Sequence, residues 1–246
     1  MNNLNEKVIL VTGSSRGIGA AIAKKLAEAG AKVIVNYAGG KTEADQTVSA
    51  IKAKGGEAIA LQADVSKAPE VKALFDKAIE QYGRIDILVN NAGIMITRLL
   101  KDITDEDFTR LFEINVRGTF NTMREAATRL ADKGSIINFS STVTRVIFPT
   151  YGIYNASKAA VEQLTRVFAK EVGNRGINVN SVSPGPTNTE LFTKGKSQEV
   201  MDRLASLSAF NRIGDPEDIA KIVVFLAGDE AKWISAQNIG INGGMA

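Results

Sequence analysis

The stretch YGIYNASK, residues 151–158, places two tyrosines ahead of a lysine in a chain that contains no histidine. A tyrosine phenol ordinarily ionises near pH ~10, so it needs help to exchange protons at neutral pH. Residues four apart share a helix face, and Tyr154 and Lys158 therefore point together. A nearby ammonium favours the phenolate and can lower the pKa of the phenol by about 1–3 units. The spacing predicts that Tyr154 is a general acid or base.

Two further polar positions could take part in this chemistry. The predicted strand over residues 134–140 runs into Ser140 and Ser141, which therefore reach the carboxyl edge of a sheet. Asn115 lies in the middle of a predicted helix, where asparagine is a poor helix former. It either bends that helix or holds a water or a backbone carbonyl inside the site. The residues alone leave these alternatives open, and a tyrosine–lysine pair by itself is more often packing plus a solvated amine.

These side chains must be positioned by the alternating elements of the chain. Short apolar runs read as parallel strands buried on both faces, and Ala-rich amphipathic stretches between them read as helices. Such alternation implies right-handed βαβ units and a doubly wound parallel sheet. The predicted strands are residues 7–12, 31–36, 57–63, 84–90, 134–140, 176–182 and 238–241. The predicted helices are residues 17–29, 41–54, 67–82, 104–131, 152–173 and 215–228.

The regular alternation weakens after Val182. Prolines, glycines and short polar residues follow, and a loop over about residues 187–212 is predicted to border the substrate. Long loops in compact domains are often functional lids.

A glycine-rich turn, TGSSRGIG at residues 12–19, follows the first predicted strand and opens the first helix. Glycine permits a tight turn and close backbone approach, and the helix N-terminus offers N–H groups to a pyrophosphate. The spacing Gly13-x3-Gly17-x-Gly19 differs from the commonest dinucleotide fingerprint, and glycine-rich turns are often merely structural. Its place directly after the first strand favours a dinucleotide site.

The end of the second predicted strand favours NADP(H) over NAD(H). An acidic side chain there accepts the adenosine ribose hydroxyl and repels a 2′-phosphate, but this chain has Asn36 and Tyr37. Arg16 supplies a guanidinium suited to phosphate. Asp64 follows the third strand and is placed for the adenine edge, and NNAG at residues 90–93 closes the fourth.

The composition excludes several classes of protein. Of 246 residues, 44% are hydrophobic, and there is no histidine or cysteine. The usual zinc ligands, disulfides, the Ser-His-Asp triad and the Cys-His pair are therefore absent. No metal site is expected from these residues, and a metal ion at the C-terminus is left open. The net charge of +3 is scattered, so nucleic-acid binding is not expected. Without a long apolar run or a signal-peptide pattern, we expect a cytoplasmic protein that does not bind membranes.

Taken in order, TGSSRGIG, NNAG, Asn115, Ser141, YNASK and PGPTNTE resemble the short-chain dehydrogenase/reductase family across essentially the whole chain. The most similar branch holds NADPH-dependent 3-oxoacyl-carrier-protein reductases and related ketone reductases and sugar dehydrogenases. The resemblance implies a single Rossmann-fold domain over residues 1–246, with a seven-stranded parallel sheet in the order 3-2-1-4-5-6-7. It also implies hydride transfer from NADPH to a ketone, giving a chiral secondary alcohol. A homotetramer assembled through the helix that carries Tyr154 and through the C-terminal helix and strand is implied as well.

The resemblance further implies a role for each matching residue. Tyr154 is the general acid, and Lys158 lowers its pKa and binds the nicotinamide ribose. Ser141 holds the substrate oxygen, and Asn115 anchors a water in a proton relay. The cofactor-lining residues are Gly13, Ser15, Arg16, Gly17, Ile18, Gly19, Asn36, Tyr37, Ala38, Asp64, Val65, Asn91, Ala92, Gly93, Tyr154, Lys158, Pro184, Gly185, Thr187 and Thr189.

The substrate is expected to be a small apolar or aromatic ketone or the corresponding alcohol. Bulky residues follow the serines, and the predicted pocket comprises Met95, Ser141, Val143, Ile147, Tyr151, Phe192, Met201 and Leu204. Carrier-protein reductases tend to have basic residues before the strand bearing the serine, and Asp132 interrupts that charge here, although Arg129, Lys133 and Arg175 remain nearby. A carrier-protein reductase and a sugar dehydrogenase stay open as alternatives, and a non-catalytic NADP-sensing protein is a further one because fold alone does not fix activity.

Overall fold

A computed structural model describes residues 4–246 of the chain. Across this part, the predicted sheet is confirmed: seven parallel strands run in the order β3-β2-β1-β4-β5-β6-β7. The strands are β1 (Val8–Val11), β2 (Lys32–Tyr37), β3 (Glu57–Gln62), β4 (Ile87–Asn90), β5 (Ser135–Phe139), β6 (Asn178–Pro184) and β7 (Asn238–Ile241). The central strands are fully buried because helices cover both faces of the sheet, as their continuous apolar sequences predict.

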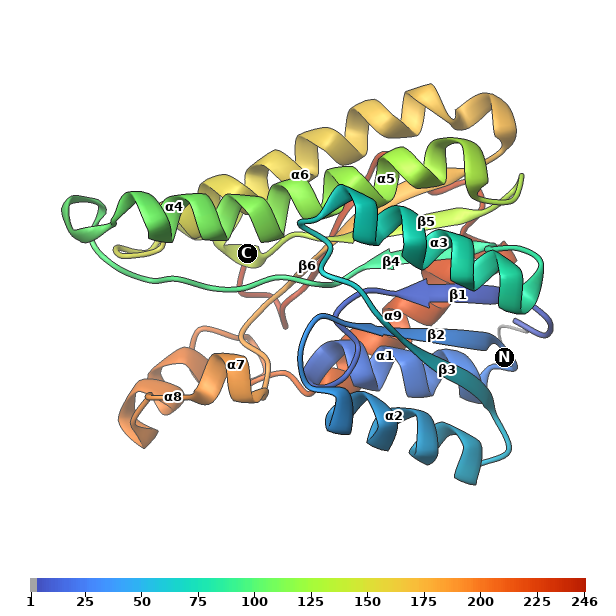
Figure 1. Ribbon diagram of the computed structural model, residues 1–246. Coiled ribbons are helices and arrows are strands. Elements are labelled where there is room, and N and C mark those ends of the chain that lie inside the picture. The colour runs from blue at the N-terminus through green and yellow to red at the C-terminus, as the bar shows by residue number, and fades with distance from the viewer. Residues whose placement is uncertain (1–3) are drawn as a thin grey trace.

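The helices form two layers around the sheet (Figure 1). One layer holds α1 (Gly17–Glu28), α2 (Lys41–Ala53) and α9 (Pro216–Ala227), whose apolar residues pack into one core cluster. The other layer holds α3 (Ala68–Tyr82), α5 (Gly118–Arg129) and α6 (Gly152–Glu171), which pack into a second cluster. The predicted doubly wound arrangement therefore has a core on each side of the sheet.

The long helix predicted over residues 104–131 is not continuous. It divides into α4 (Asp105–Phe112), a π-helical turn (Glu113–Arg117) and α5. The cause lies at Asn115, whose side-chain amide bonds the backbone of Ile94 from the segment after β4. Single π-turns inside helices are rare and occur frequently at functional sites. In the structure, Asn115 therefore lies in a distorted turn of the helix and also binds a backbone carbonyl.

The segment from 187 to 212 is partly helical. It contains the short helices α7 (Glu190–Thr193) and α8 (Gln198–Ala205), which lie together to one side of the main body in Figure 1. Thr189 and Ser197 cap them by accepting bonds from backbone N–H groups. Four-residue and eight-residue helices are too short to be stable alone, so this segment depends on the contacts it makes with the body.

A buried network of polar side chains fixes β5 relative to β4 and the covering helices. Asn90 donates to Asn138 at 2.8 Å, and Asn138 donates to Thr165 of α6 at 2.8 Å. Thr122 of α5 donates to Asn90 at 2.7 Å. Because buried amides are costly when left unpaired, this set of mutually satisfied bonds permits one register of β5 against α6. That register determines where the residues after β5 lie.

Candidate active site

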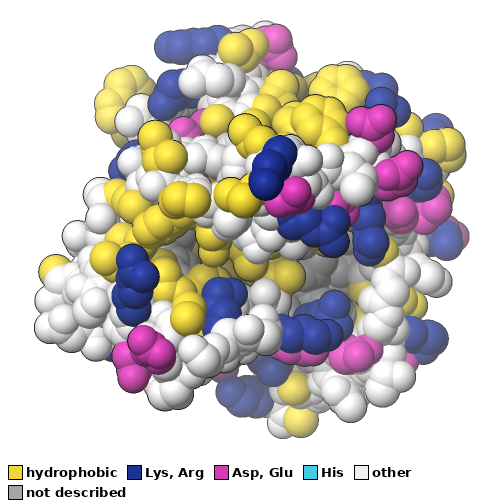
Figure 2. All heavy atoms as spheres, turned by 90° about the vertical axis from the view of Figure 1, so that its left-hand side faces the viewer, with side chains coloured by type: hydrophobic (Ala, Val, Ile, Leu, Met, Phe, Trp, Pro, Cys, Tyr) yellow, Lys and Arg dark blue, Asp and Glu magenta, His cyan; other side chains and the backbone are white. Residues whose placement is uncertain are grey.

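A cavity of about 490 Å³ opens at the carboxyl ends of the strands. It straddles β1 and β4, where the strand order reverses and where open α/β sheets bind ligands. Figure 2 looks at this edge and shows the hollow, with hydrophobic side chains on one side of it and Lys and Arg side chains toward the other. The cavity therefore has an apolar end and a more basic end.

The glycine-rich turn forms the floor of the basic end. Gly13 has a φ of +60°, and a Cβ there would lie 2.8 Å from the Cα of Ala92. A Cβ on Gly19 would lie 2.5 Å from the Gly13 carbonyl oxygen. Asn91 holds the turn from the other side by donating to the Thr12 and Gly13 carbonyls, each at 2.9 Å. Only glycine fits both positions, so backbone rather than side chain faces the cavity.

Asn36 lies at the end of β2, but its amide is directed inward. It accepts from the Gly13 N–H at 3.2 Å and donates to the carbonyls of Leu61 and Ala63. An aspartate in its place would set a buried carboxylate against two carbonyl oxygens. Asn36 therefore shapes the turn, and contacts at the outer end of the cavity fall to Tyr37, Ala38 and the exposed Arg16.

The helix that follows the turn also faces the cavity. Arg16 is the N-cap residue of α1 and makes no side-chain cap bond. Within residues 4–246, its guanidinium has no hydrogen-bond or ion-pair partner, so it is available to an anion. The first N–H groups of a helix also lack intrahelical partners, and they carry a partial positive charge. The basic end of the cavity therefore suits a phosphate-bearing ligand.

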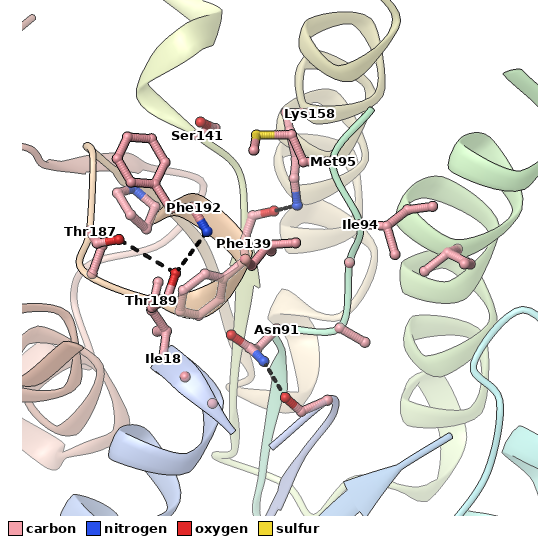
Figure 3. Close-up of a pocket in the computed structure, with 18 of the residues that line it drawn as sticks. Ile18, Asn91, Ile94, Met95, Phe139, Ser141, Lys158, Thr187, Thr189 and Phe192 are labelled. Carbon is pink, nitrogen blue, oxygen red and sulfur yellow. Dashed lines mark hydrogen bonds between the residues drawn. The ribbon is translucent and has the colours of Figure 1, made fainter. Parts of the chain in front are cut away.

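At the apolar end, Ser141, Tyr154 and Lys158 converge on the cavity. Lys158 is buried, and its ammonium donates to the Phe139 carbonyl at 2.8 Å, as Figure 3 shows. The same nitrogen lies 5.8 Å from the centre of the Tyr154 ring. Tyr154 is half-buried, and the Ser141 side chain lies close enough to influence its pKa. One helix and the end of one strand thus bring a phenol, an amine and a hydroxyl together.

The pKa of Tyr154 does not move downward as the spacing with Lys158 predicts. Burial raises it to about 12, and the hydrogen bond with Ser141 opposes this rise only in part. Burial also lowers the pKa of Lys158 to about 8. The expectation was wrong for this state because desolvation is the largest influence on the pKa of Tyr154, while the Lys158 ammonium is engaged by a backbone carbonyl. Near neutral pH the phenol is therefore protonated.

Asn115 lies behind the cavity rather than on its wall. Its side chain exchanges two hydrogen bonds with the Ile94 backbone and donates a third to Ser157 of α6 at 3.2 Å. Ile94 itself lines the cavity, as does Gly93 before it. Asn115 therefore fixes the segment after β4 against α6, and its side chain is fully occupied in doing so.

Every residue of the predicted cofactor-lining set borders the cavity. Asp64 is among them, although its carboxylate accepts two bonds from Ser66 within its own turn. Of the predicted substrate pocket, Met95, Ser141, Val143, Tyr151, Phe192 and Leu204 also border it. Ile147 and Met201 do not, and Ile147 is 81% exposed to solvent.

Several lining residues were missed by the sequence reasoning. Phe148 and Leu191 lie next to predicted positions and could have been found from them, whereas Met245 could not. Met245 reaches the cavity because the Asn242 amide bonds Thr142 at 3.2 Å and the Asn242 carbonyl accepts from Met245 N–H. Nothing in the sequence indicates that long-range contact.

Two negative findings apply to the described residues. No helix in residues 4–246 is both long enough and apolar enough to cross a bilayer. The same part of the chain contains no group of three or more acidic, histidine or cysteine side chains arranged to hold a metal ion.

Comparisons with known proteins agree with this geometry. A family model described as enoyl-(acyl carrier protein) reductase matches residues 13–246. An oxidoreductase of Methylorubrum extorquens, described as uncharacterized, is 45% identical over 100% of both chains. Versicolorin reductase of Emericella nidulans is 42% identical over 98% of this chain and 96% of its own.

Solved structures are similar as well. The angucycline C-6 ketoreductase LanV, solved with bound NADP, has a TM-score of 0.94 and 39% identity, covering 99% of this chain and 97% of its own. This chain belongs to the short-chain dehydrogenase/reductase family of oxidoreductases.

Proposed function

We propose that this protein is an NADPH-dependent reductase that converts a prochiral ketone into a chiral secondary alcohol. The observation that carries the proposal is the convergence of Ser141, Tyr154 and Lys158 at one end of a cavity whose other end is a glycine turn. A dinucleotide and a small carbonyl compound would then meet between the two ends.

The residues at the basic end fit a dinucleotide. Side chains are excluded at Gly13 and Gly19, so a pyrophosphate could approach the backbone and the N-terminus of α1. Arg16 has no partner within residues 4–246 and would meet a 2′-phosphate. NADPH supplies the hydride when bound. The bound NADP named for LanV supports this preference.

The residues at the apolar end fit the proton side of a carbonyl reduction. Tyr154 carries its proton near neutral pH and borders the cavity, so it would donate that proton to the substrate oxygen. Ser141 would donate a hydrogen bond to the same oxygen and share its developing charge with Tyr154. Lys158 would hold the ribose and favour the phenolate that remains.

The apolar wall supports an aromatic or otherwise hydrophobic ketone. The rings of Phe148, Tyr151 and Tyr154 form a continuous edge, with centroid separations of 5.9 and 6.3 Å. Phe192 and Met95 also border the cavity (Figure 3). Such rings prefer edge-to-face or offset contacts with a flat ligand. The names of LanV and of versicolorin reductase, both reductases, are consistent with this class.

A carrier-protein substrate is less well supported, although the matching family model carries that description. Arg175 is bound internally to Asp132 and to the carbonyls of Ala127 and Leu130. Arg129 is paired with two carboxylates. Both arginines lie beside the start of β5, whereas Ser141 follows its end at the opposite edge of the sheet. Their positive charges are therefore already paired, and they lie far from the cavity entrance at which an acidic carrier protein would have to deliver its substrate.

Replacing Tyr154 with phenylalanine removes the proposed proton donor and keeps the ring. We expect kcat for an aryl ketone to fall by about 10³-fold, since positioned general acids contribute 10²–10⁴-fold. NADPH oxidation followed by absorbance measures this, and fluorescence titration should give an unchanged Kd for NADPH. An active variant would show that another group supplies the proton.

The substrate class needs a panel run alongside that experiment. Aryl ketones, acetoacetyl thioesters and sugars with NADP⁺ distinguish a ketone reductase, a carrier-protein reductase and a sugar dehydrogenase. Tight NADPH binding without turnover of any member would instead indicate a cofactor-sensing protein.

Lys158 should leave a signature in the pH dependence of stability. Its pKa is lowered from 10.5 in the unfolded chain to about 8, so the unfolded state binds more protons between these values. The folded state therefore gains stability from this group as pH rises through that window. From pH 7.5 to 9.5 the wild type should gain about 2 kcal/mol relative to Lys158→Met. Urea unfolding at both pH values measures the difference, and parallel curves for the two proteins would contradict it.

The preference for NADPH over NADH is best tested by substitutions at positions other than Asn36, because the Asn36 side chain is buried and bonded within the turn. Arg16→Ala should raise KM for NADPH by about tenfold or more, because a charge-assisted bond contributes about 1.5–3 kcal/mol. KM for NADH should stay unchanged, which serves as the internal control. Ala38→Asp places a carboxylate on an exposed position of the cavity rim and should shift preference toward NADH. Equal effects of Arg16→Ala on both cofactors would contradict a 2′-phosphate contact.

We also propose a homotetramer, supported by exposed apolar side chains on both surfaces named by the resemblance. Val167 is exposed on α6 and Phe225 on α9, and Trp233 is fully exposed before β7. Light scattering should give about 105 kDa, four times the 26.3 kDa chain. A single species at the chain mass would rule the assembly out.

A further inference from the structure

The run SSTVT at residues 140–144 carries four hydroxyl groups, and only one of them is left for a substrate. Ser140 and Thr142 are buried, whereas Ser141 is partly exposed to the cavity. Thr142 donates to the Ser183 carbonyl at 3.0 Å. Ser140 and Thr144, on either side of Ser141, both have a carboxylate as their nearest acceptor.

That carboxylate belongs to Glu162 of α6. Its Oε1 atom accepts from Ser140 Oγ at 2.6 Å and from Thr144 Oγ1 at 2.7 Å. Hydrogen bonds to an ionised acceptor are shorter and about twice as strong as neutral ones. One oxygen therefore bonds the hydroxyls on both sides of Ser141, so the Ser140 hydroxyl is engaged by Glu162 although Ser140 itself borders the cavity.

Glu162 continues a series of contacts along one face of α6. Residues 154, 158 and 162 are each four apart, so they occupy successive turns of the same face. Lys158 bonds the Phe139 carbonyl, and Asn155 donates to the Val143 carbonyl at 2.6 Å. The segment that bears Ser141 is thus bonded to the same helix as Tyr154, and Glu162 supplies the contacts farthest from the phenol.

We propose that Glu162 is a positioning residue for the reaction: it selects Ser141 among the four hydroxyls and sets its distance from Tyr154. This inference rests on the proposed ketone reduction. Glu162 acts through Ser140 and Thr144, so its effect should depend on Ser141 being present. A misplacement of about 1 Å in a catalytic group can cost about 10²-fold in rate.

The test compares Glu162→Leu, which keeps the size but loses the acceptor, with Glu162→Gln, which retains an acceptor oxygen. For the leucine variant we expect kcat to fall by about 10- to 100-fold, while the glutamine variant stays within about threefold of the wild type. The Kd for NADPH should be unchanged in both. Gln163→Ala, at an exposed position of the same helix, is the matched control and should match the wild type.

A double-mutant cycle separates positioning from a general loss of structure. In a Ser141→Ala background, Glu162→Leu should lower kcat by less than about twofold, because the group it positions is gone. An equal fall in both backgrounds would overturn the proposal, as would full activity of the leucine variant. Should Glu162→Leu not fold, Ser140→Ala combined with Thr144→Val removes the same two bonds from the other side and must give the same result.

A structural measurement tests the positioning role of Glu162 even if the protein does not reduce ketones. A crystal structure of Glu162→Leu should have residues 140–144 displaced, with the distance between the Ser141 and Tyr154 hydroxyl oxygens changed. If the segment superposes on the wild type with that distance retained, the proposal is wrong, whether or not any ketone is reduced.

Discussion

The bond between the buried Lys158 ammonium and the Phe139 carbonyl is the contact on which the apolar end of the cavity depends. It joins α6 to the last residue of β5, and the helix and the strand contribute Tyr154 and Ser141 respectively. Burying an ammonium is unfavourable, which is why the pKa of Lys158 falls to about 8. The bonds from Asn138 to Thr165 and from Ser140 to Glu162 also hold the helix and strand in one register. Under the proposed function, this arrangement would supply a confined proton donor to a chain without histidine.

The other end of the cavity depends on backbone geometry rather than on charge. Glycines let β1, the segment after β4 and the N-terminus of α1 approach more closely than any side chain would permit. Asn36 and Asn91 direct their amides into the turn and leave few polar side chains facing outward. Binding at this end would then come from N–H groups and from Arg16, both suited to phosphate. The two ends share one sheet edge, so both are positioned by the order of strands.

Much of this architecture could be predicted from the sequence because its causes are local. Continuous apolar runs identified the buried strands, and helical spacing placed Tyr154 and Lys158 on one face. The division of the predicted 104–131 helix could not be predicted, since it arises from Asn115 bonding Ile94 across the fold. The positions of Met245 and Glu162 beside the cavity segments could not be predicted either, because the contacts that place them join residues distant in the sequence. The direction of the Tyr154 pKa shift was also missed, because spacing reveals a neighbouring charge but not the extent of burial.

Burial has opposite consequences for the two ionisable groups at the apolar end. It favours the neutral form of each, so the pKa of Tyr154 rises while that of Lys158 falls. Between about pH 8 and pH 12, the Tyr154 phenol keeps its proton and the Lys158 amine loses its own. Both groups are then neutral, whereas their spacing suggested a phenolate paired with an ammonium. With a pKa of about 8, Lys158 is still mostly charged near neutral pH, and its ammonium donates to the Phe139 carbonyl. Under the proposed function, the reaction at this end would therefore depend on how well that carbonyl and the adjoining hydroxyls of residues 140–144 are held in place.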